Sequence, residues 1–317
     1  MTFTNDFERD THKGLTDYPK HLSSKYFYDS TGDALFQQIM GLPEYYLTRT
    51  ETAILNSHKA QLCDQFTALG TPFQLCELGA GDGSKTKILL QELLESGAQF
   101  SYTPIDISSS ALTGLGQSLQ RQFPQLHYTP LNDTYFTSLA KLKTMGSRKV
   151  ILFMGSNIGN LLHPQALDFL KKLRESMNTE DLLCIGFDLK KHPQRILDAY
   201  NDPQGVTEAF NKNILSRINS EMGGNFDLDA FLHWEVYDPE TGTAKSFLVS
   251  KRQQQVSIPK IGLDVSFEPW ETIHTEISQK YDHNTISWLC SESGLEIVEV
   301  FTDGNDQYGN YILKPNV

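Results

Sequence analysis

The chain has 317 residues, a formal net charge of −12 and an apolar fraction of 39%. These values predict one large globular domain or two closely joined ones, and they exclude a mostly disordered chain. An acidic chain of this kind is a poor candidate for binding nucleic acid, which needs a phosphate-neutralising surface. The four cysteines are scattered without a C-x-x-C pair, so we expect neither a metal site nor a disulfide framework.

The N-terminal segment is polar. Residues 1–19 lack the apolar core of a signal peptide, and no apolar run approaches the roughly 20 residues that span a membrane. We therefore expect a soluble, cytoplasmic protein without a membrane partner. A monomer is expected as well. The first 23 residues or so are expected to be poorly ordered. Helices are expected next, over 34–40 and 51–69.

From residue 72, strand-like and helix-like segments alternate, which predicts a parallel sheet with crossover helices. The expected strands are 72–76, 101–107, 126–131, 149–154 and 182–188, and the expected helices are 85–95, 108–123 and 164–177. The alternation stops after residue 190. There, helices are expected at 196–199 and 206–222, and antiparallel strands at 231–236, 244–251 and 254–258. A helix at 284–293 and strands at 295–301 and 311–314 then resume the first pattern.

This order of elements predicts an α/β protein with a Rossmann-like, doubly wound sheet and a second, smaller α+β lobe. The expected cofactor-binding domain consists of residues 60–195 and 282–317. The expected substrate lobe consists of residues 20–59 and 196–281.

A glycine-rich loop, E-L-G-A-G-D-G-S-K-T (77–86), follows the first of these strands and opens a helix. Such a loop leaves backbone N–H groups available to a ligand, and its glycines permit a tight turn. A phosphate-binding P-loop and a dinucleotide fingerprint both need a glycine where Ser84 stands. The remaining interpretations are an ordinary strand–helix turn and the G-x-G-x-G loop, preceded by an acidic residue, that is typical of S-adenosylmethionine (SAM) methyltransferases.

Polar residues follow four consecutive strands, and ligands of open α/β sheets bind beyond the carboxyl ends of their strands. Glu77 ends the first strand, and Asp106 ends the second, where a carboxylate can accept both ribose hydroxyls. Asn132 and Asp133 end the third strand, where an adenine amine needs an acceptor. The segment 155–160 ends the fourth, where the reacting group is expected. Asp106 alone is equally well interpreted as a helix N-cap, but the four ends together favour a cofactor site.

Six segments resemble those of a known family. They are K-Y-F-Y-D-S-T-G (25–32), L-P-E-Y-Y-L-T-R-T-E (42–51), the glycine loop (77–86), G-S-N-I-G-N (155–160), A-Y-N-D-P-Q-G-V-T-E-A-F-N-K-N (199–213) and T-E-I-S-Q-K-Y (275–281). Over nearly the whole chain they resemble the histidine Nα-methyltransferases of ergothioneine biosynthesis, which are class I SAM-dependent methyltransferases with a separate substrate lobe. The first two segments and T-E-I-S are far more specific than the glycine loop.

The resemblance implies roles for individual residues. Tyr45 and Asn160 are implied to be catalytic residues at the amine of an amino-acid substrate. The implied substrate-binding residues are Tyr28, Gly155, Tyr200, Ser246, Glu276 and Ser278. The implied SAM-binding residues are Glu77, Gly79, Gly81, Lys85, Asp106, Asn132 and Asp133.

Within the substrate set, Tyr200 is implied to hold the carboxylate, and Glu276 and Ser278 to hydrogen-bond the imidazole nitrogens. One position departs from the family, because its methionine beside the imidazole falls on Ser246. A serine makes the wall of that pocket smaller and more polar, which leaves the identity of the side chain open.

The function that these residues favour is SAM-dependent Nα-methylation of a free amino acid, with L-histidine converted to its trimethyl betaine, hercynine. Methylation of tryptophan, tyrosine or a substituted histidine stays open because of Ser246. Two other classes also remain, a catalytically silent protein on the same fold and a nicotinamide-dependent dehydrogenase.

Overall fold

The computed structural model describes residues 2–144 and 146–316. The chain folds as two compact units, each built from two separate stretches of sequence. The first unit consists of Met1–Tyr46 and Lys191–Ser278, and the second of Leu47–Lys190 and Gln279–Val317. Within the described residues, no helix combines the length and apolar character that crossing a membrane requires.

The second unit is a seven-stranded sheet in the order β11-β12-β5-β4-β1-β2-β3. Its strands are β1 (Phe73–Leu78), β2 (Phe100–Asp106), β3 (Leu131–Asn132), β4 (Arg148–Phe153), β5 (Leu182–Asp188), β11 (Leu295–Thr302) and β12 (Tyr308–Pro315). The first five run parallel, and β11 and β12 form an antiparallel hairpin along β5. The order reverses between β1 and β4, so the sheet is doubly wound, as expected.

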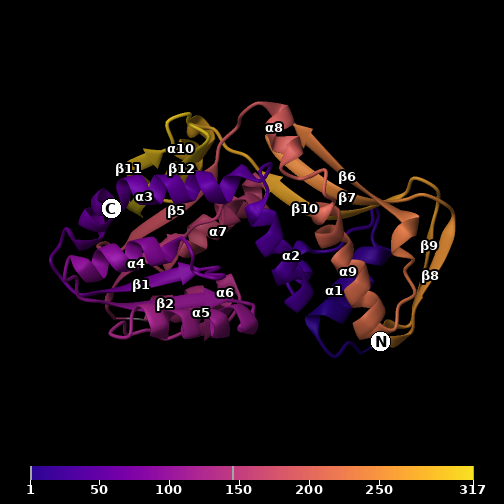
Figure 1. Cartoon of the computed structure of the whole chain (residues 1–317), viewed down its shortest axis with the longest axis horizontal. Coiled ribbons are helices and arrows are strands. Elements are labelled where there is room, and N and C mark those ends of the chain that lie inside the picture. The colour runs from indigo at the N-terminus through magenta and orange to yellow at the C-terminus, as the bar shows by residue number, and fades with distance from the viewer. Residues whose placement is uncertain (1, 145, 317) are drawn as a thin grey trace. The chain divides into compact units, whose positions relative to one another are not determined.

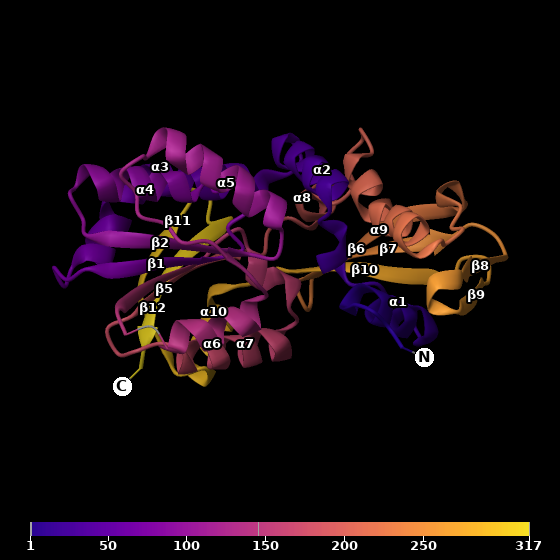
Figure 2. The ribbon, with the colours of Figure 1, turned by 90° about the horizontal axis from the view of Figure 1, so that it is seen from below.

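Helices cover both faces of this sheet (Figure 2). One face carries α3 (Tyr46–Thr67), α4 (Thr86–Glu95) and α5 (Ser109–Gln122), with α4 contributing the buried Leu89, Leu90 and Leu93. The other face carries α6 (Tyr135–Thr144), α7 (His163–Glu175) and α10 (His283–Glu292). Apolar residues at helical spacing form each buried stripe, which explains why the sequence pattern located most of these helices.

The sequence pattern was wrong in two places of the second unit. The third strand was expected over 126–131 but pairs with β2 only at Leu131–Asn132, with a single further bridge at Tyr128. Helix α6 was not expected at all.

The first unit contains a three-stranded sheet in the order β10-β7-β6 and a two-stranded sheet of β8 and β9. These strands are β6 (Phe231–Asp238), β7 (Thr243–Ser250), β8 (Gln254–Ile258), β9 (Leu263–Phe267) and β10 (Thr272–Gln279). The helices are α1 (Asp6–Thr16), α2 (Ser30–Gly41), α8 (Pro193–Asp198) and α9 (Val206–Met222), and α9 lies alongside α2 (Figure 1). Strands β9 and β10 were not expected.

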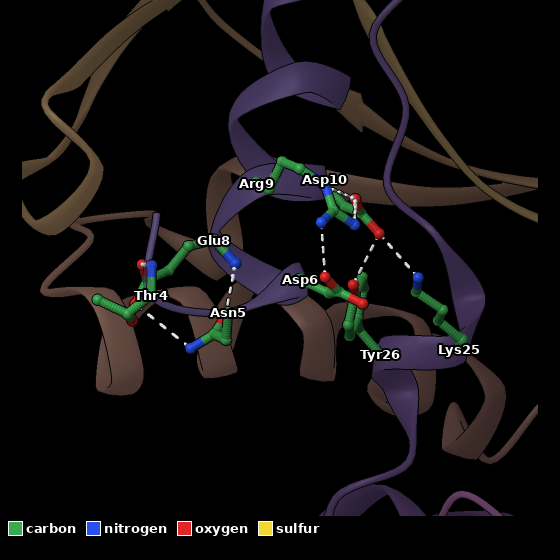
Figure 3. A network of polar contacts seen from close by, with 8 residues as sticks. All are labelled: Thr4, Asn5, Asp6, Glu8, Arg9, Asp10, Lys25 and Tyr26. Carbon is green, nitrogen blue, oxygen red and sulfur yellow. Dashed lines mark hydrogen bonds and ion pairs between the residues drawn. The ribbon is translucent and has the colours of Figure 1, made fainter. Parts of the chain in front are cut away.

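The N-terminal residues form helix α1, which corrects the expectation of poor order. Asn5 caps the helix by accepting a hydrogen bond from Glu8 N at 2.9 Å, and the Glu8 carboxylate accepts one from Thr4 N at 2.7 Å. Asp10 then accepts bonds from Lys25 Nζ at 2.7 Å and Tyr26 OH at 2.8 Å (Figure 3). These capping hydrogen bonds and the contacts of Asp10 hold the polar segment in a helix.

The division between the units differs from the expected domain boundaries. The expected boundary between residues 59 and 60 falls inside α3, which is one continuous helix. Ile54, Leu55 and Leu62 of this helix pack into the core of the second unit, so the whole helix after Tyr46 belongs there.

Candidate active site

The glycine loop after β1 has three residues with left-handed backbone, Gly79 (φ 76°), Gly81 (φ 53°) and Gly83 (φ 65°). A Cβ on Gly79 would lie 2.6 Å from the hydroxyl of Tyr135, so this position has no room for a side chain. A Cβ on Gly81 would meet no described atom within 4 Å. The loop is therefore closed by packing on one side and open at Gly81, where a ligand can approach the backbone.

Asp106 ties the end of β2 to this loop. Its Oδ2 accepts a hydrogen bond from Gly81 N at 2.9 Å, and its Oδ1 accepts one from Ser108 N at 2.9 Å. The N-cap of α5 is Ser108, whose hydroxyl accepts from Ala111 N, so the interpretation of Asp106 as that helix's N-cap is wrong. A carboxylate oxygen can accept more than one hydrogen bond, which a ribose-binding carboxylate at this position requires.

Asn132 and Asp133 both stabilise the strand ends. Asn132 Nδ2 donates to the carbonyl oxygens of Asp106 at 2.9 Å and Ile107 at 3.0 Å. Asp133 forms an ion pair with Lys141 at 2.6 Å, and this hydrogen bond is the main cause that lowers the pKa of Asp133. The structure therefore brings both residues beside Asp106.

Glu77 is buried and is used within the fold. Its carboxylate accepts a hydrogen bond from Thr86 Oγ1 at 2.5 Å and another from the Tyr102 hydroxyl. Burial raises the pKa of Glu77 to about 7. Thr86 begins α4 and Tyr102 lies in β2, so the buried Glu77 carboxylate connects the helix after the glycine loop to the neighbouring strand and is not exposed to solvent.

Glu51 is a site residue to which the sequence analysis assigned no role. It is 1% exposed, and its carboxylate accepts hydrogen bonds from Lys85 Nζ at 2.6 Å, Gly155 N at 2.9 Å and Asn310 Nδ2 at 3.0 Å. One side chain of α3 thus joins the glycine loop, the end of β4 and strand β12. The only sequence signal was its place at the end of the segment 42–51.

The turn after β4 is conformationally unusual. Gly155 (φ 75°) and Ser156 (φ 55°) are both left-handed, and Ser156 Oγ accepts a hydrogen bond from Asp188 N at 3.2 Å. A left-handed serine is uncommon and persists when its surroundings hold it in place. The turn leads into the short helix Asn157–Asn160, which ends with the exposed Asn160.

In the first unit, four of the predicted substrate residues come together on and beside the three-stranded sheet. Tyr200 OH donates to Ser278 Oγ at 2.6 Å, and Ser246 Oγ lies 3.5 Å from Glu276 Oε2. Glu276 and Ser278 are two residues apart in β10, and Ser246 is in β7. We call these four residues the ring cluster. Tyr200 is 7% exposed and Ser246 is 1% exposed, so the cluster is largely shielded from water.

Tyr28 and Tyr45 form a separate aromatic group around Phe36 of α2. The ring of Phe36 makes edge-on contacts with Tyr28 at 5.7 Å and Tyr45 at 6.2 Å between centroids. The ring of Phe210, in α9, packs against Tyr28 with 5.6 Å between the ring centroids. Tyr45, in the segment 42–51, therefore belongs to a packed aromatic group.

The doubly wound sheet, its antiparallel final hairpin and the glycine loop at the end of β1 define the Rossmann-like architecture of class I methyltransferases. The chain belongs to the family of SAM-dependent, histidine-specific methyltransferases, whose sequence pattern matches residues 7–315. The expected family, enzyme class and cofactor are thereby confirmed.

Three relatives illustrate the range of this family. The chain is 34% identical to the histidine N-alpha-methyltransferase of Mycolicibacterium smegmatis over 301 residues, covering 95% of this chain and 92% of that protein. It is 28% identical to ergothioneine biosynthesis protein 1 of Schizosaccharomyces pombe, covering 92% of this chain and 38% of that protein. It is 25% identical to the 4-dimethylallyltryptophan N-methyltransferase of Claviceps purpurea, covering 95% of this chain and 93% of that protein.

Proposed function

We propose that this protein transfers methyl groups from SAM to the α-amine of free L-histidine and forms the trimethyl betaine, hercynine. The observation that carries the proposal is the ring cluster, in which a carboxylate and an oriented serine hydroxyl lie together. The similarity to a histidine N-alpha-methyltransferase over nearly the full length of both chains supports it.

The glycine loop and Asp106 fit a nucleoside-bearing cofactor, because an open backbone position lies directly beside a carboxylate. When bound, SAM supplies a methyl group that its sulfonium makes electrophilic. Asp106 would accept the ribose hydroxyls, Gly81 would let the cofactor approach the loop, and Gly79 would let the loop pack against Tyr135. Asn132 and Asp133 would bind the adenine end, and Lys85 and Glu77 would hold the loop in place.

The α-amine needs orientation more than it needs a strong base. An α-amine has a pKa of about 8, so a useful fraction is neutral at physiological pH. Placing its lone pair in line with the methyl group is the main catalytic effect available, and such orientation can supply ~7–11 kcal/mol. Tyr45 and Asn160 are proposed to accept hydrogen bonds from the amine, and Tyr28 and Gly155 to contact the same amino acid. The implied role of Tyr200 at the carboxylate needs its phenol proton, which is donated to Ser278, so we place Tyr200 with the ring cluster.

The ring cluster is proposed to select the side chain. Glu276 would accept an imidazole N–H, and a carboxylate in this place raises the pKa of the ring that it binds. Tyr200 donates to Ser278, which orients the serine hydroxyl for the second ring nitrogen.

A second candidate is N-methylation of another amino acid. Ser246 favours it, since the resemblance implies a methionine in that place, and one relative is an N-methyltransferase of a tryptophan derivative. Mass spectrometry of the purified protein incubated with SAM and a pool of the standard amino acids separates the two. We expect histidine to gain three methyl groups, and exclusive methylation of another amino acid would refute the histidine assignment.

A further inference from the structure

The last three residues of the segment T-E-I-S-Q-K-Y (275–281) have no role so far. Gln279, Lys280 and Tyr281 lie at and after the end of β10 and belong to the second unit, as do β5 and the turn after β4. All three are at most 1% exposed, and a lysine is almost never fully buried unless a charge pairs with it. The burial of Lys280 therefore needs an explanation within this unit.

Lys280 forms a buried ion pair with Asp188, the last residue of β5. Its Nζ lies 2.7 Å from Asp188 Oδ2, and both side chains are 0% exposed. Main-chain hydrogen bonds join the same two segments, because Tyr281 N donates to Asp188 O at 2.9 Å and Lys190 N donates to Tyr281 O at 2.7 Å. The carboxyl end of β5 is thus fixed to the segment 279–281 by one charge pair and two main-chain bonds.

The same two segments hold the turn after β4 through two further hydrogen bonds. Asp188 N donates to Ser156 Oγ at 3.2 Å, and Tyr281 OH donates to Ile158 O at 3.1 Å. Ser156 has a left-handed backbone (φ 55°), a conformation that a serine keeps only when its surroundings hold it there. One bond is made at this residue and the other two residues later, so the contacts hold the backbone where its conformation is least favourable on its own.

The short helix Asn157–Asn160 also packs directly on the segment 279–281. A Cβ on Gly159 would lie 3.0 Å from the carbonyl oxygen of Gln279, so the two backbones approach closely. Asn160 comes next and is exposed. Its side chain can place a substrate amine only if the backbone that presents it stays in position, since a misplacement of about 1 Å can cost about a hundredfold in rate.

We propose that Lys280 is a positioning residue, whose ion pair with Asp188 holds the turn after β4, and with it Asn160, in the geometry that methyl transfer needs. This inference rests on the proposed function, and specifically on the role proposed for Asn160. A buried ion pair adds little net stability compared with apolar residues of the same volume, but its charge-assisted hydrogen bond fixes two segments in one geometry. Such a fixed geometry is what the left-handed turn requires.

The test replaces both charges, Lys280→Met together with Asp188→Asn, because removing one partner alone leaves an unpaired buried charge. The same unit offers a matched control. Lys149 and Asp181 form an ion pair of the same length, 2.7 Å, with both side chains 0% exposed, at the amino ends of β4 and β5. Lys149→Met together with Asp181→Asn therefore makes the same change in charge and burial at the other end of these strands.

Histidine turnover is measured per SAM-binding site, counted by calorimetry, so that an unfolded fraction does not lower the result. We expect Lys280→Met/Asp188→Asn to lower kcat about tenfold and to change the dissociation constant of SAM less than threefold. The control should keep kcat within twofold of the wild type. Hydrogen exchange of the peptide 155–161, followed by mass spectrometry, should become at least tenfold faster in the first variant only.

Ser156→Ala keeps both charges and removes one of the two hydrogen bonds to the turn, so it serves if the double variant does not fold, and the same two results are expected. Unchanged exchange in 155–161 would overturn the proposal, and so would faster exchange with kcat within twofold of the wild type. An equal loss of kcat in the control would also overturn it. If the wild type methylates no histidine, the proposed function itself fails, while the exchange measurement still decides whether Lys280 holds the turn.

Discussion

Replacing Glu51 with glutamine tests whether one buried carboxylate holds the second unit's site together. The variant keeps the shape of the side chain and removes its charge. Lys85, Gly155 and Asn310 all donate to Glu51, so a glutamine presents one carbonyl oxygen to three donors and adds an amide donor of its own. At least one donor then loses its partner.

The burial of Glu51 sets the expected loss in the free energy of unfolding. Removing one partner of a buried ion pair costs ~3–5 kcal/mol, and an unsatisfied buried donor costs ~1–3 kcal/mol. Glu51 is 1% exposed, but the Lys85 side chain is 20% exposed, so water solvates part of the ammonium charge that the substitution leaves unpaired. We therefore expect the lower end, a loss of about 3 kcal/mol from the free energy of unfolding, which is a large fraction of a typical total.

Urea unfolding followed by tryptophan fluorescence measures this loss. Of the three tryptophans, Trp288 lies in the second unit and Trp234 and Trp270 lie in the first. Replacing the latter two with phenylalanine makes the emission report on the unit that contains Glu51. Glu175→Gln, at an exposed position of α7, is the control and should change stability by less than ~0.5 kcal/mol.

A double variant separates the lost charge from other effects. Glu51→Gln combined with Lys85→Met should be more stable than the sum of the single losses, because no unpaired ammonium remains. A loss below ~1 kcal/mol in Glu51→Gln, or strict additivity in the double variant, would refute the reasoning.

Three further predictions concern the ligand sites and the loop. Glu276→Ala should raise the dissociation constant of histidine at least tenfold in calorimetry and leave SAM binding unchanged; an unaltered histidine affinity would remove Glu276 from the site. Burial raises the pKa of Glu77 from 4.5 to about 7, so the folded state holds this proton more tightly and the contribution of Glu77 to stability falls as pH rises through that window. The stability difference between wild type and Glu77→Gln should therefore fall by ~3 kcal/mol from pH 4.5 to pH 8 in urea titrations, whereas a constant difference would mean that folding leaves the pKa of Glu77 unchanged. Gly79→Ala should lower the free energy of unfolding in urea more than Gly81→Ala, since both residues have positive φ but only the Cβ at Gly79 would meet Tyr135, at 2.6 Å; equal losses would show that backbone strain alone matters.

Sequence patterns worked best where structure depends on near neighbours. Strand β5 and helix α9 were predicted with the bounds that the structure has, because a buried apolar run and a helical apolar stripe are local signals. Helix α1 was missed because its residues are polar, although its asparagine N-cap, Asn5, is visible in the sequence. Strand β10 was missed although its T-E-I-S segment had been singled out for its chemistry.

The sequence by itself determined the alternating sheet, the glycine loop and the family to which the chain belongs, since these are encoded within a few consecutive residues or in short specific segments. The tertiary structure decided how each carboxylate is used. Glu51 accepts hydrogen bonds from Gly155 and Asn310, which are 104 and 259 positions away. Glu77 and Asp106, which were predicted as SAM-binding residues, accept hydrogen bonds from Thr86 and Gly81 of the glycine-loop segment. Glu235, in β6, keeps one carboxylate oxygen without a hydrogen-bond partner among the described residues. Hydrogen bonding acts through space between segments far apart in the chain, so no local pattern distinguishes these carboxylates.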